Sequence, residues 1–217
     1  MNLLHSDDAL LVIEKPAGLP VLPDGWAPDS PYLVKLLEGE YGKVWVVHRL
    51  DKITSGVMLL ARTAEAHREL NRQFDQREVE KVYHAIVAGT PAWDEQVCQA
   101  ALRANVGHKH RTVVDGERGK ASETRFKVLE RGQAGALVEA RPVTGRTHQI
   151  RVHLSALGFP LLGDVLYGAA GGGLLDHPAL HAVSLAFTHP LSKQRLAFSA
   201  AYPQDFVTAL KCLGFER

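Results

Sequence analysis

A short polar loop between two apolar runs constrains this chain more than any other stretch. Residues 44–47 and 57–61 have the length and composition of buried strands. The loop between them carries one carboxylate, Asp51, and ends in Ser55-Gly56. Two strands would hold that carboxylate rigidly, as an acid, a base or a nucleophile must be held. The same residue types also form ordinary turns, and the spacing by itself favours a turn over catalysis.

The identities within this loop resemble a known signature. Residues 48–56 read His-Arg-Leu-Asp-Lys-Ile-Thr-Ser-Gly and are similar to the His-Arg-Leu-Asp-x-x-Thr-Ser-Gly element of the RluA family of RNA pseudouridine synthases. Seven fixed identities in nine positions rarely coincide by chance. In that family the Asp of this element is catalytic, so the resemblance implies that Asp51 is the nucleophile or base of an RNA uridine isomerase.

Further elements of the same family follow in its order along the chain. Residues 11–19 resemble its Asn-Lys-Pro-x-Gly element, with Glu14 in place of the usual Asn. Residues 81–85 resemble its Lys-x-Tyr-x-Ala strand, and residues 145–153 match Gly-Arg-x-His-Gln-x-Arg-x-His. The remaining matches are Gly163-Asp164, Tyr167-Gly168, His181-Ala182 and Thr188-His189-Pro190. The resemblance covers roughly residues 8–203, and Glu14 lies outside the residues that carry the chemistry.

The expected architecture is an α+β domain, because strands that are often adjacent in sequence alternate with a few helices. The resemblance implies the pseudouridine synthase fold, a bent, mixed and largely antiparallel sheet flanked by helices, with a central active-site cleft. No linker or internal repeat divides the 217 residues, so we expect a single catalytic domain over residues 1–217, with a flexible loop at residues 171–173. Its first strand begins near Met1, so no S4-type RNA-binding domain is expected ahead of it.

Two helices are expected beside these motifs. Thr63 can cap a helix that runs to about Gln76. Its buried face would consist of every fourth residue, namely Ala66, Leu70 and Phe74. Thr147 can cap a second helix, which would end at Gly158. Arg146 would then lie at a helix N-terminus, where backbone N–H groups favour anions.

The resemblance also implies how the site works. Pseudouridine formation breaks the glycosidic bond of a uridine, turns the uracil and rejoins it through C5, so no cofactor or metal is expected. One carboxylate suffices, whether it attacks C1′ or removes a sugar proton. In the family, the residue matching Arg146 pairs with the catalytic Asp and favours its ionised form. The residue matching Tyr83 packs against the target base, and proton transfer is a second role open to it. Without the resemblance, Arg146 would be a surface charge and Tyr83 a half-buried strand aromatic.

Candidate RNA-binding residues lie in two places. The target base must leave its stack, and the residue matching Arg49 fills the space in the family. A planar guanidinium can stack on bases and bind phosphates, and His48 precedes it. Residues 103–131 hold eight Lys or Arg against four acids, and the candidate phosphate-binding residues among them are Lys109 and Arg111. This segment is either a basic arm that grips phosphates or a solvated hairpin.

The expected partner is RNA, in the form of a tRNA or rRNA stem-loop whose bases splay out for recognition. The net charge of +1 neither favours nor excludes such a partner. Cys98 and Cys212 show no Cys-x-x-Cys spacing, which fits a reducing compartment. The apolar run near the N-terminus is too short for a signal peptide, and no stretch approaches a membrane span. We therefore expect a cytoplasmic monomer without membrane contact.

Three other interpretations remain open at this point. The protein could be an RNA-binding relative that keeps the fold but has lost catalysis. The retention of Asp51, Tyr83 and Arg146 argues against this. A hydrolase could use Asp51 on another substrate, but no partner nucleophile, base or metal motif accompanies it. A metal hydrolase could use His177 and His181, but their spacing lacks the His-Glu-x-x-His pattern.

Overall fold

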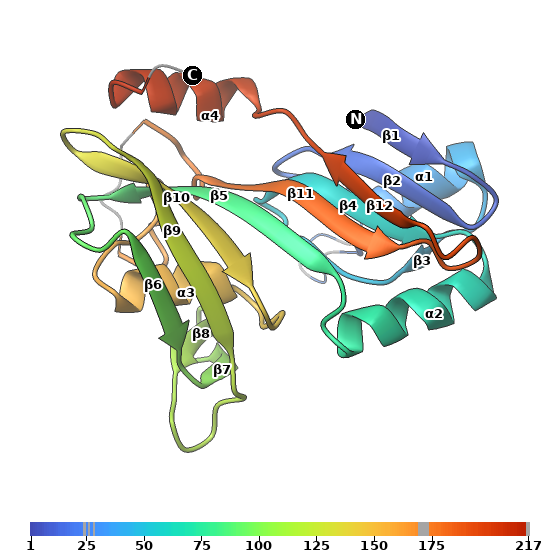
Figure 1. Cartoon of the computed structure of the whole chain (residues 1–217), viewed down its shortest axis with the longest axis horizontal. Coiled ribbons are helices and arrows are strands. Elements are labelled where there is room, and N and C mark those ends of the chain that lie inside the picture. The colour runs from blue at the N-terminus through green and yellow to red at the C-terminus, as the bar shows by residue number, and fades with distance from the viewer. Residues whose placement is uncertain (24, 26, 28, 169–173, 216–217) are drawn as a thin grey trace. The chain divides into compact units, whose positions relative to one another are not determined.

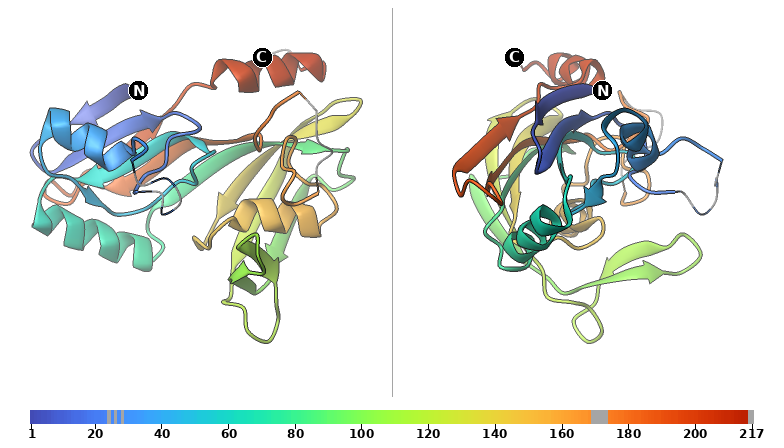
Figure 2. Two further views of the ribbon diagram at one scale, coloured as in Figure 1. Left: turned by 180° about the vertical axis from the view of Figure 1, so that it is seen from behind. Right: turned by 90° about the vertical axis from the view of Figure 1, so that its right-hand side faces the viewer.

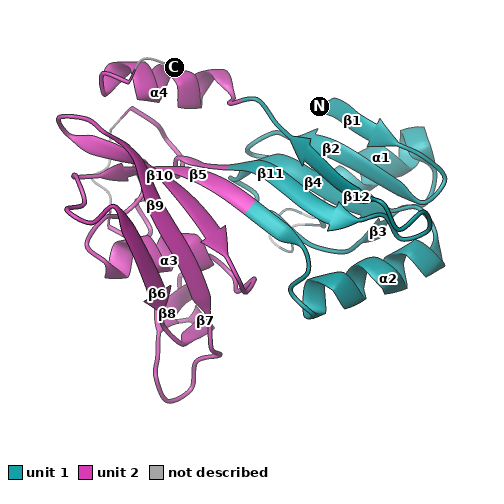
Figure 3. Ribbon diagram, viewed as in Figure 1, with its two compact units in different colours: residues 1–81, 182–201 teal, residues 82–181, 202–217 magenta. Residues whose placement is uncertain are grey.

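The computed structural model describes residues 1–23, 25, 27, 29–168 and 174–215, and the chain divides into two compact units (Figures 1 and 3). Unit 1 comprises residues 1–81 and 182–201, and unit 2 comprises residues 82–181 and 202–217. Each unit is therefore assembled from separate stretches of the chain. The expected loop at residues 171–173 lies outside the described residues, and the single domain over residues 1–217 stays a prediction.

Unit 1 packs helices against a sheet. Its elements are β1 (Asn2–Ser6), β2 (Leu10–Lys15), α1 (Leu33–Tyr41), β3 (Trp45–Val46), β4 (Ser55–Ala61), α2 (Ala64–Asp75), most of β11 (Leu180–Thr188) and β12 (Arg195–Ser199). The strand order is β1-β2-β4-β11, with β12 beside β11 and β3 beside β4. The pairs β1–β2, β2–β4, β3–β4 and β11–β12 are antiparallel. Every residue of β4 is buried, as expected of the apolar run that follows the Asp51 loop.

Helix α2 confirms the capping signal in the sequence. The Thr63 side chain accepts a hydrogen bond from the Ala66 N–H at 3.1 Å, and Ala66 and Leu70 are buried in the core that includes β4. The buried side chain of Gln73 attaches the helix to the end of β11. It accepts from the Thr188 N–H at 2.9 Å and donates to the Thr188 carbonyl at 2.8 Å. These contacts fix α2 against the sheet.

Unit 2 places helices on both faces of a second antiparallel group of strands. Its elements are most of β5 (Glu80–Ala88), β6 (Glu95–Gln99), β7 (Leu102–Val106), β8 (Arg111–Val114), β9 (Glu123–Arg131), β10 (Gly135–Pro142), α3 (Gln149–Ala156) and α4 (Gln204–Cys212). The order is β5-β10-β9-β6, and β7 and β8 form a separate hairpin that projects from the unit (Figure 2). Ile150 and Leu154 of α3 pack with Val138 of β10, while Phe206 of α4 packs with Leu137.

The predicted α+β class is confirmed, but the predicted cap of α3 is wrong. Helix α3 begins at Gln149, and its N-cap is His148, which has φ of 54° and makes no capping hydrogen bond through its side chain. The Gln149 side chain instead folds back over the preceding turn, where its Oε1 accepts from the Arg146 N–H at 3.0 Å and from the Thr144 hydroxyl at 2.7 Å. Thr147 is exposed. Among the described residues, no helix is long and apolar enough to cross a membrane.

Candidate active site

The loop that carries Asp51 is held closely within unit 1. Asp51 is half-buried, and its carbonyl accepts from the Thr54 N–H at 3.0 Å, so the local turn chemistry expected from the sequence is present. At the end of the loop, Gly56 has φ of +118° and approaches β11 so closely that a Cβ would lie 2.2 Å from the Ala182 carbonyl oxygen. Only glycine fits this position. The backbone at the end of the loop is therefore fixed by its close contact with β11.

A buried ammonium group supports the same loop. Lys15, at the end of β2, is fully buried, and its Nζ donates to the carbonyls of Pro16 and Leu19 at 2.8 Å each and of Lys52 at 3.1 Å. Burial lowers the pKa of Lys15 to about 8, and the negative charge of Asp51 acts in the opposite direction. Lys15 thus joins the 15–19 turn to the Asp51 loop and places a positive charge where it acts on that carboxylate. The motif that contains Lys15 carries no local signal for this role.

His48 braces the start of the loop. Its Nε2 accepts from the Leu59 N–H at 3.0 Å, and its ring stacks on Phe74 of α2 with centroids 4.9 Å apart. Burial lowers the pKa of His48 to about 3, and the positive charge of Lys81 acts in the same direction. The imidazole is therefore neutral near pH 7, with its proton on Nδ1. Arg49, the next residue, is exposed.

We expect His48 to make the protein sensitive to acid. Its pKa is about 3 in the folded protein and about 6.5 in an unfolded chain, so the unfolded state binds more protons between these pH values. The free energy of unfolding should therefore fall as the pH is lowered from about 6.5 towards 3. His48→Gln keeps an acceptor for Leu59 without titrating, and urea unfolding at pH 7 and pH 4 should show a shallower fall. The exposed His108→Gln control should follow wild type, and an unchanged fall in His48→Gln would contradict the assignment.

Unit 2 carries the two other residues expected at the site. Tyr83 is half-buried on β5, opposite Ala140 of β10, and packs against the core cluster that includes Ile150. Arg146 is exposed on the turn before α3, and its Nε donates to the Ala121 carbonyl at 3.3 Å.

The side chain of Gln149 connects the turn before α3 to strand β9. Besides its bonds to Thr144 and Arg146, its Nε2 donates to the Glu123 carbonyl and to the Thr124 hydroxyl, both at 2.9 Å. The position of Arg146 therefore depends on contacts between the turn and strand β9. Asp51 belongs to unit 1, and Tyr83 and Arg146 belong to unit 2.

The comparisons with known proteins identify the family. Residues 9–156 match the family model of the RNA pseudouridylate synthases. The chain belongs to this family. Like its family, this pseudouridine synthase is an isomerase that converts uridine to pseudouridine in RNA.

Individual relatives match nearly the whole chain. The pseudouridine synthase is 36% identical to ribosomal large subunit pseudouridine synthase D of Zymomonas mobilis, over 98% of this chain and 73% of that protein. It is 37% identical to the dual-specificity RNA pseudouridine synthase RluA of Escherichia coli, over 94% of this chain and 93% of that protein. The solved structure of human RNA pseudouridylate synthase domain containing 4 is 29% identical, with a TM-score of 0.81 over 99% of this chain and 94% of that one. The predicted family and fold are confirmed.

The basic segment of this pseudouridine synthase falls into two different structures. Residues 102–114 form the β7–β8 hairpin, with Lys109 exposed in its turn and Arg111 exposed at the start of β8. The guanidinium of Arg111 lies 5.5 Å from the ring centroid of Tyr167. Residues 123–131 are instead strand β9 of the larger sheet, and their basic side chains pair with acids. These pairs are Arg125–Glu123, Lys127–Glu95 and Arg131–Asp94. The hairpin therefore exposes Lys109 and Arg111, whereas the basic side chains of β9 are paired with acids.

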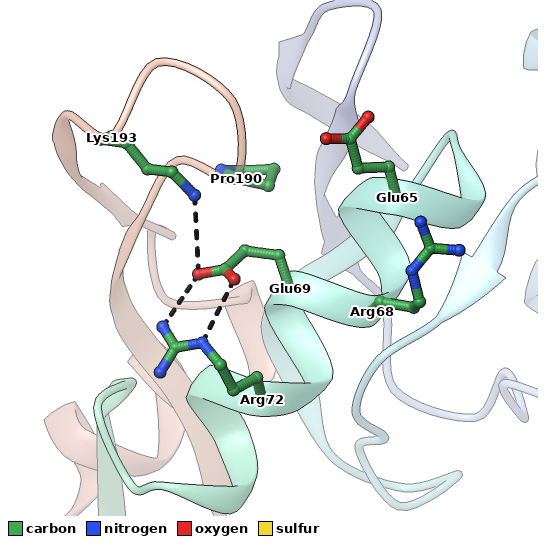
Figure 4. Close-up of a pocket in the computed structure, with 6 residues that line it drawn as sticks. All are labelled: Glu65, Arg68, Glu69, Arg72, Pro190 and Lys193. Carbon is green, nitrogen blue, oxygen red and sulfur yellow. Dashed lines mark hydrogen bonds and ion pairs between the residues drawn. The ribbon is translucent and has the colours of Figure 1, made fainter.

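Two other features contain none of the predicted catalytic or RNA-binding residues. A surface pocket on α2 of unit 1 is lined by Glu65, Arg68, Glu69, Arg72, Pro190 and Lys193 (Figure 4). Within it, Glu69 pairs with Arg72 at 2.9 Å and with Lys193 at 3.8 Å.

The two histidines considered as metal ligands, His177 and His181, lie in unit 2 and have different neighbours. His177 pairs with Asp205 at 2.8 Å, and His181 packs against the rings of Tyr202 and Phe206.

Proposed function

We propose that Asp51 is the catalytic residue of this pseudouridine synthase and that Arg146 and Tyr83 complete its site. The observation that carries the proposal is the construction of the Asp51 loop, which the fully buried Lys15 holds at the Lys52 carbonyl and Gly56 holds against β11. A surface turn without function needs no buried charge beneath it, because burying an ammonium group is costly. The match of the family model across this segment supports the same assignment.

The proposed chemistry needs one ionised carboxylate. Asp51 either attacks C1′ of the uridine and releases the uracil, or removes a sugar proton as the glycosidic bond breaks. After the uracil has turned, its C5 attacks C1′ and displaces the Asp51 carboxylate in the first route. In the second route C5 bonds to C1′ while the sugar carbon regains its proton. In both routes C5 then loses its proton to solvent, and the ring nitrogen released from the sugar gains one. Arg146 favours the ionised carboxylate, and Tyr83 packs against the uracil. The C5 proton provides a direct signal for the reaction.

We further propose that the substrate is a tRNA or rRNA stem-loop and that the protein acts on it as a cytoplasmic monomer. The Zymomonas mobilis relative is named for the large ribosomal subunit, and the Escherichia coli relative is named as dual-specificity. Extracting the target base costs a few kcal/mol, and the exposed Arg49 beside Asp51 is suited to fill the space that it leaves. His48, predicted from the sequence to bind RNA together with Arg49, has its Nε2 bonded to the Leu59 N–H and its ring stacked on Phe74, so we propose that it holds the start of the loop instead of contacting RNA.

The assignment is tested by incubating the protein with tRNA and rRNA hairpin transcripts that carry uridine tritiated at C5. Release of tritium from one transcript, at one mapped position, is the expected result. If the protein binds one or more of the transcripts but none of them releases tritium, the result would favour a non-catalytic RNA-binding protein instead. Cleavage of the transcript or loss of uracil would indicate a hydrolase.

We expect the hairpin residues Lys109 and Arg111 to bind phosphates. Changing both to Gln should weaken RNA binding and flatten its salt dependence, by roughly 0.7–0.9 in the log–log slope for each phosphate that is no longer neutralised. The matched control is Arg125→Gln with Lys127→Gln, which removes the same charge from residues paired on β9. Fluorescence anisotropy between about 50 and 200 mM salt, the range over which such interactions respond strongly, measures the slope. Equal slopes in the hairpin variant and wild type would make the hairpin a solvated surface element.

A further inference from the structure

We propose that the hydroxyl group of Tyr167 positions Arg146, because it ties the β7–β8 hairpin to the turn that precedes α3. The inference rests on the roles proposed above for Arg146 and for the hairpin, and it adds a residue to which no role has been assigned. Tyr167 acts through its neighbours and is a positioning residue rather than a catalytic one.

Tyr167 is buried at the junction of three segments of unit 2. Its ring packs with Leu102 of β7 and Val152 of α3. Its backbone carbonyl accepts from the Ser155 hydroxyl of α3 at 2.7 Å. Its own hydroxyl oxygen accepts from the Thr112 N–H of β8 at 2.9 Å. The side chain thereby fixes the hairpin against α3 by packing and by a hydrogen bond.

The same hydroxyl group reaches the turn that carries Arg146. It lies 2.8 Å from Nδ1 of His148, whose ring meets the Tyr167 ring nearly at right angles. Burial raises the pKa of Tyr167, so the phenol keeps its proton at neutral pH. The oxygen can therefore accept from Thr112 while its proton is donated to His148. One hydroxyl group connects strand β8 to the turn.

The connection matters because His148 has a backbone conformation that needs support. Its φ of 54° lies in the left-handed region, which residues other than glycine adopt at a cost. His148 and Gln149 both attach the turn to its surroundings, His148 to Tyr167 and Gln149 to strand β9. Arg146 lies two residues before His148. Without the Tyr167 hydroxyl group, the turn would keep the Gln149 attachment and lack the attachment through His148.

The Tyr167 ring makes cation–π contacts with two guanidinium groups. Arg111 of the hairpin lies 5.5 Å from the ring centroid and Arg151 of α3 lies 4.9 Å from it. Arg151 is itself fixed by a buried pair of hydrogen bonds to Asp164, at 2.7 and 2.8 Å. A phosphate held by Arg111 is therefore held in a defined position relative to the turn of Arg146. Tyr167 thus links RNA binding at the hairpin to the orientation of the proposed catalytic guanidinium.

The test is Tyr167→Phe, which keeps the ring with its apolar and cation–π contacts and removes both hydrogen bonds. We expect kcat in the tritium-release assay to fall about 10- to 100-fold, since a misplacement of about 1 Å can cost that much. KM and the Kd for the transcript should change less than about threefold, because the variant affects the orientation of Arg146 more than the binding of RNA. The control is Tyr202→Phe, which removes a phenolic hydroxyl group that bonds to His84 elsewhere in unit 2. A kcat loss in that control equal to that of Tyr167→Phe would indicate a general structural effect and overturn the inference.

A double-mutant cycle separates positioning of Arg146 from a structural role. In an Arg146→Lys background, Tyr167→Phe should cost less than about threefold further in kcat, because the group that it positions is already changed. His148→Ala should reproduce the loss in kcat and be nearly insensitive to a second change at Tyr167. Full additivity in both cycles would overturn the inference. Wild-type kcat in Tyr167→Phe, with Arg146→Lys impaired, would overturn this inference alone, whereas wild-type kcat in Arg146→Lys would overturn the role of Arg146 as well.

Discussion

Asp51→Asn is expected to lose at least about 10³-fold in the rate of tritium release, the usual loss when a central catalytic group is removed. The amide keeps the size of the side chain and can still form hydrogen bonds, but it can act neither as a nucleophile nor as a base. The turn that holds residue 51 is fixed by backbone bonds and by Lys15, so it should survive the change. RNA affinity and the melting temperature should therefore stay close to wild type.

The matched control is Asp75→Asn, which removes an exposed carboxylate at the end of α2 in the same unit. Single-turnover tritium release gives the rate, and fluorescence anisotropy with the same transcript gives the affinity. The control should retain full activity. Asp51→Asn activity within tenfold of wild type would remove Asp51 from the mechanism, and a loss of RNA binding in parallel would indicate a structural role instead.

Arg146→Lys is expected to reduce activity by about two orders of magnitude, although the charge is retained. Arginine presents a planar fork that can bind a carboxylate through two hydrogen bonds, whereas lysine presents a point charge on a flexible chain. A weaker interaction with Asp51 favours its ionised form less. The acid limb of the pH–rate profile should therefore move to higher pH in the variant.

The matched control for Arg146→Lys is the same substitution at another arginine of unit 2. Arg131→Lys changes a residue of β9 whose Nη2 pairs with Asp94 at 2.7 Å, and it should leave both the rate and the profile unchanged. The profile is obtained from kcat/KM for tritium release over the range in which the protein stays folded. An active Arg146→Lys variant with the wild-type profile would contradict the proposed pairing with Asp51.

Features with local signals could be predicted from the sequence. The start of α2 follows from Thr63 and the periodic residues after it, and the structure shows the expected capping bond. The apolar run at residues 57–61 predicted a strand, and β4 covers it. The family followed from seven identities in the Asp51 loop, not from physical reasoning, because the residue types alone favoured a turn. The turn is indeed present, so the spacing was compatible with both interpretations.

The remainder depends on residues that meet only after folding. A lysine at the end of an apolar strand gives no sign that its ammonium group will donate a hydrogen bond to the carbonyl of Lys52, 37 positions away. The cap expected at Thr147 is absent because α3 begins two residues later, at Gln149. Gln149 binds Thr124 and the Glu123 carbonyl on β9, and no local pattern encodes those partners. A charge count likewise could not separate the exposed hairpin from the paired strand β9 within the basic segment.

Carbodiimide-based mapping of pseudouridine in total RNA, from cells with and without the gene, tests most directly whether Asp51 catalyses uridine isomerisation in a cellular RNA. We expect one signal, in a tRNA or rRNA stem-loop, to disappear without the gene. Expression of the wild-type protein should restore it, and expression of Asp51→Asn at the same level should not. Full restoration by Asp51→Asn would exclude Asp51 as the catalytic residue, and an identical map with and without the gene would exclude the proposed activity on these RNAs.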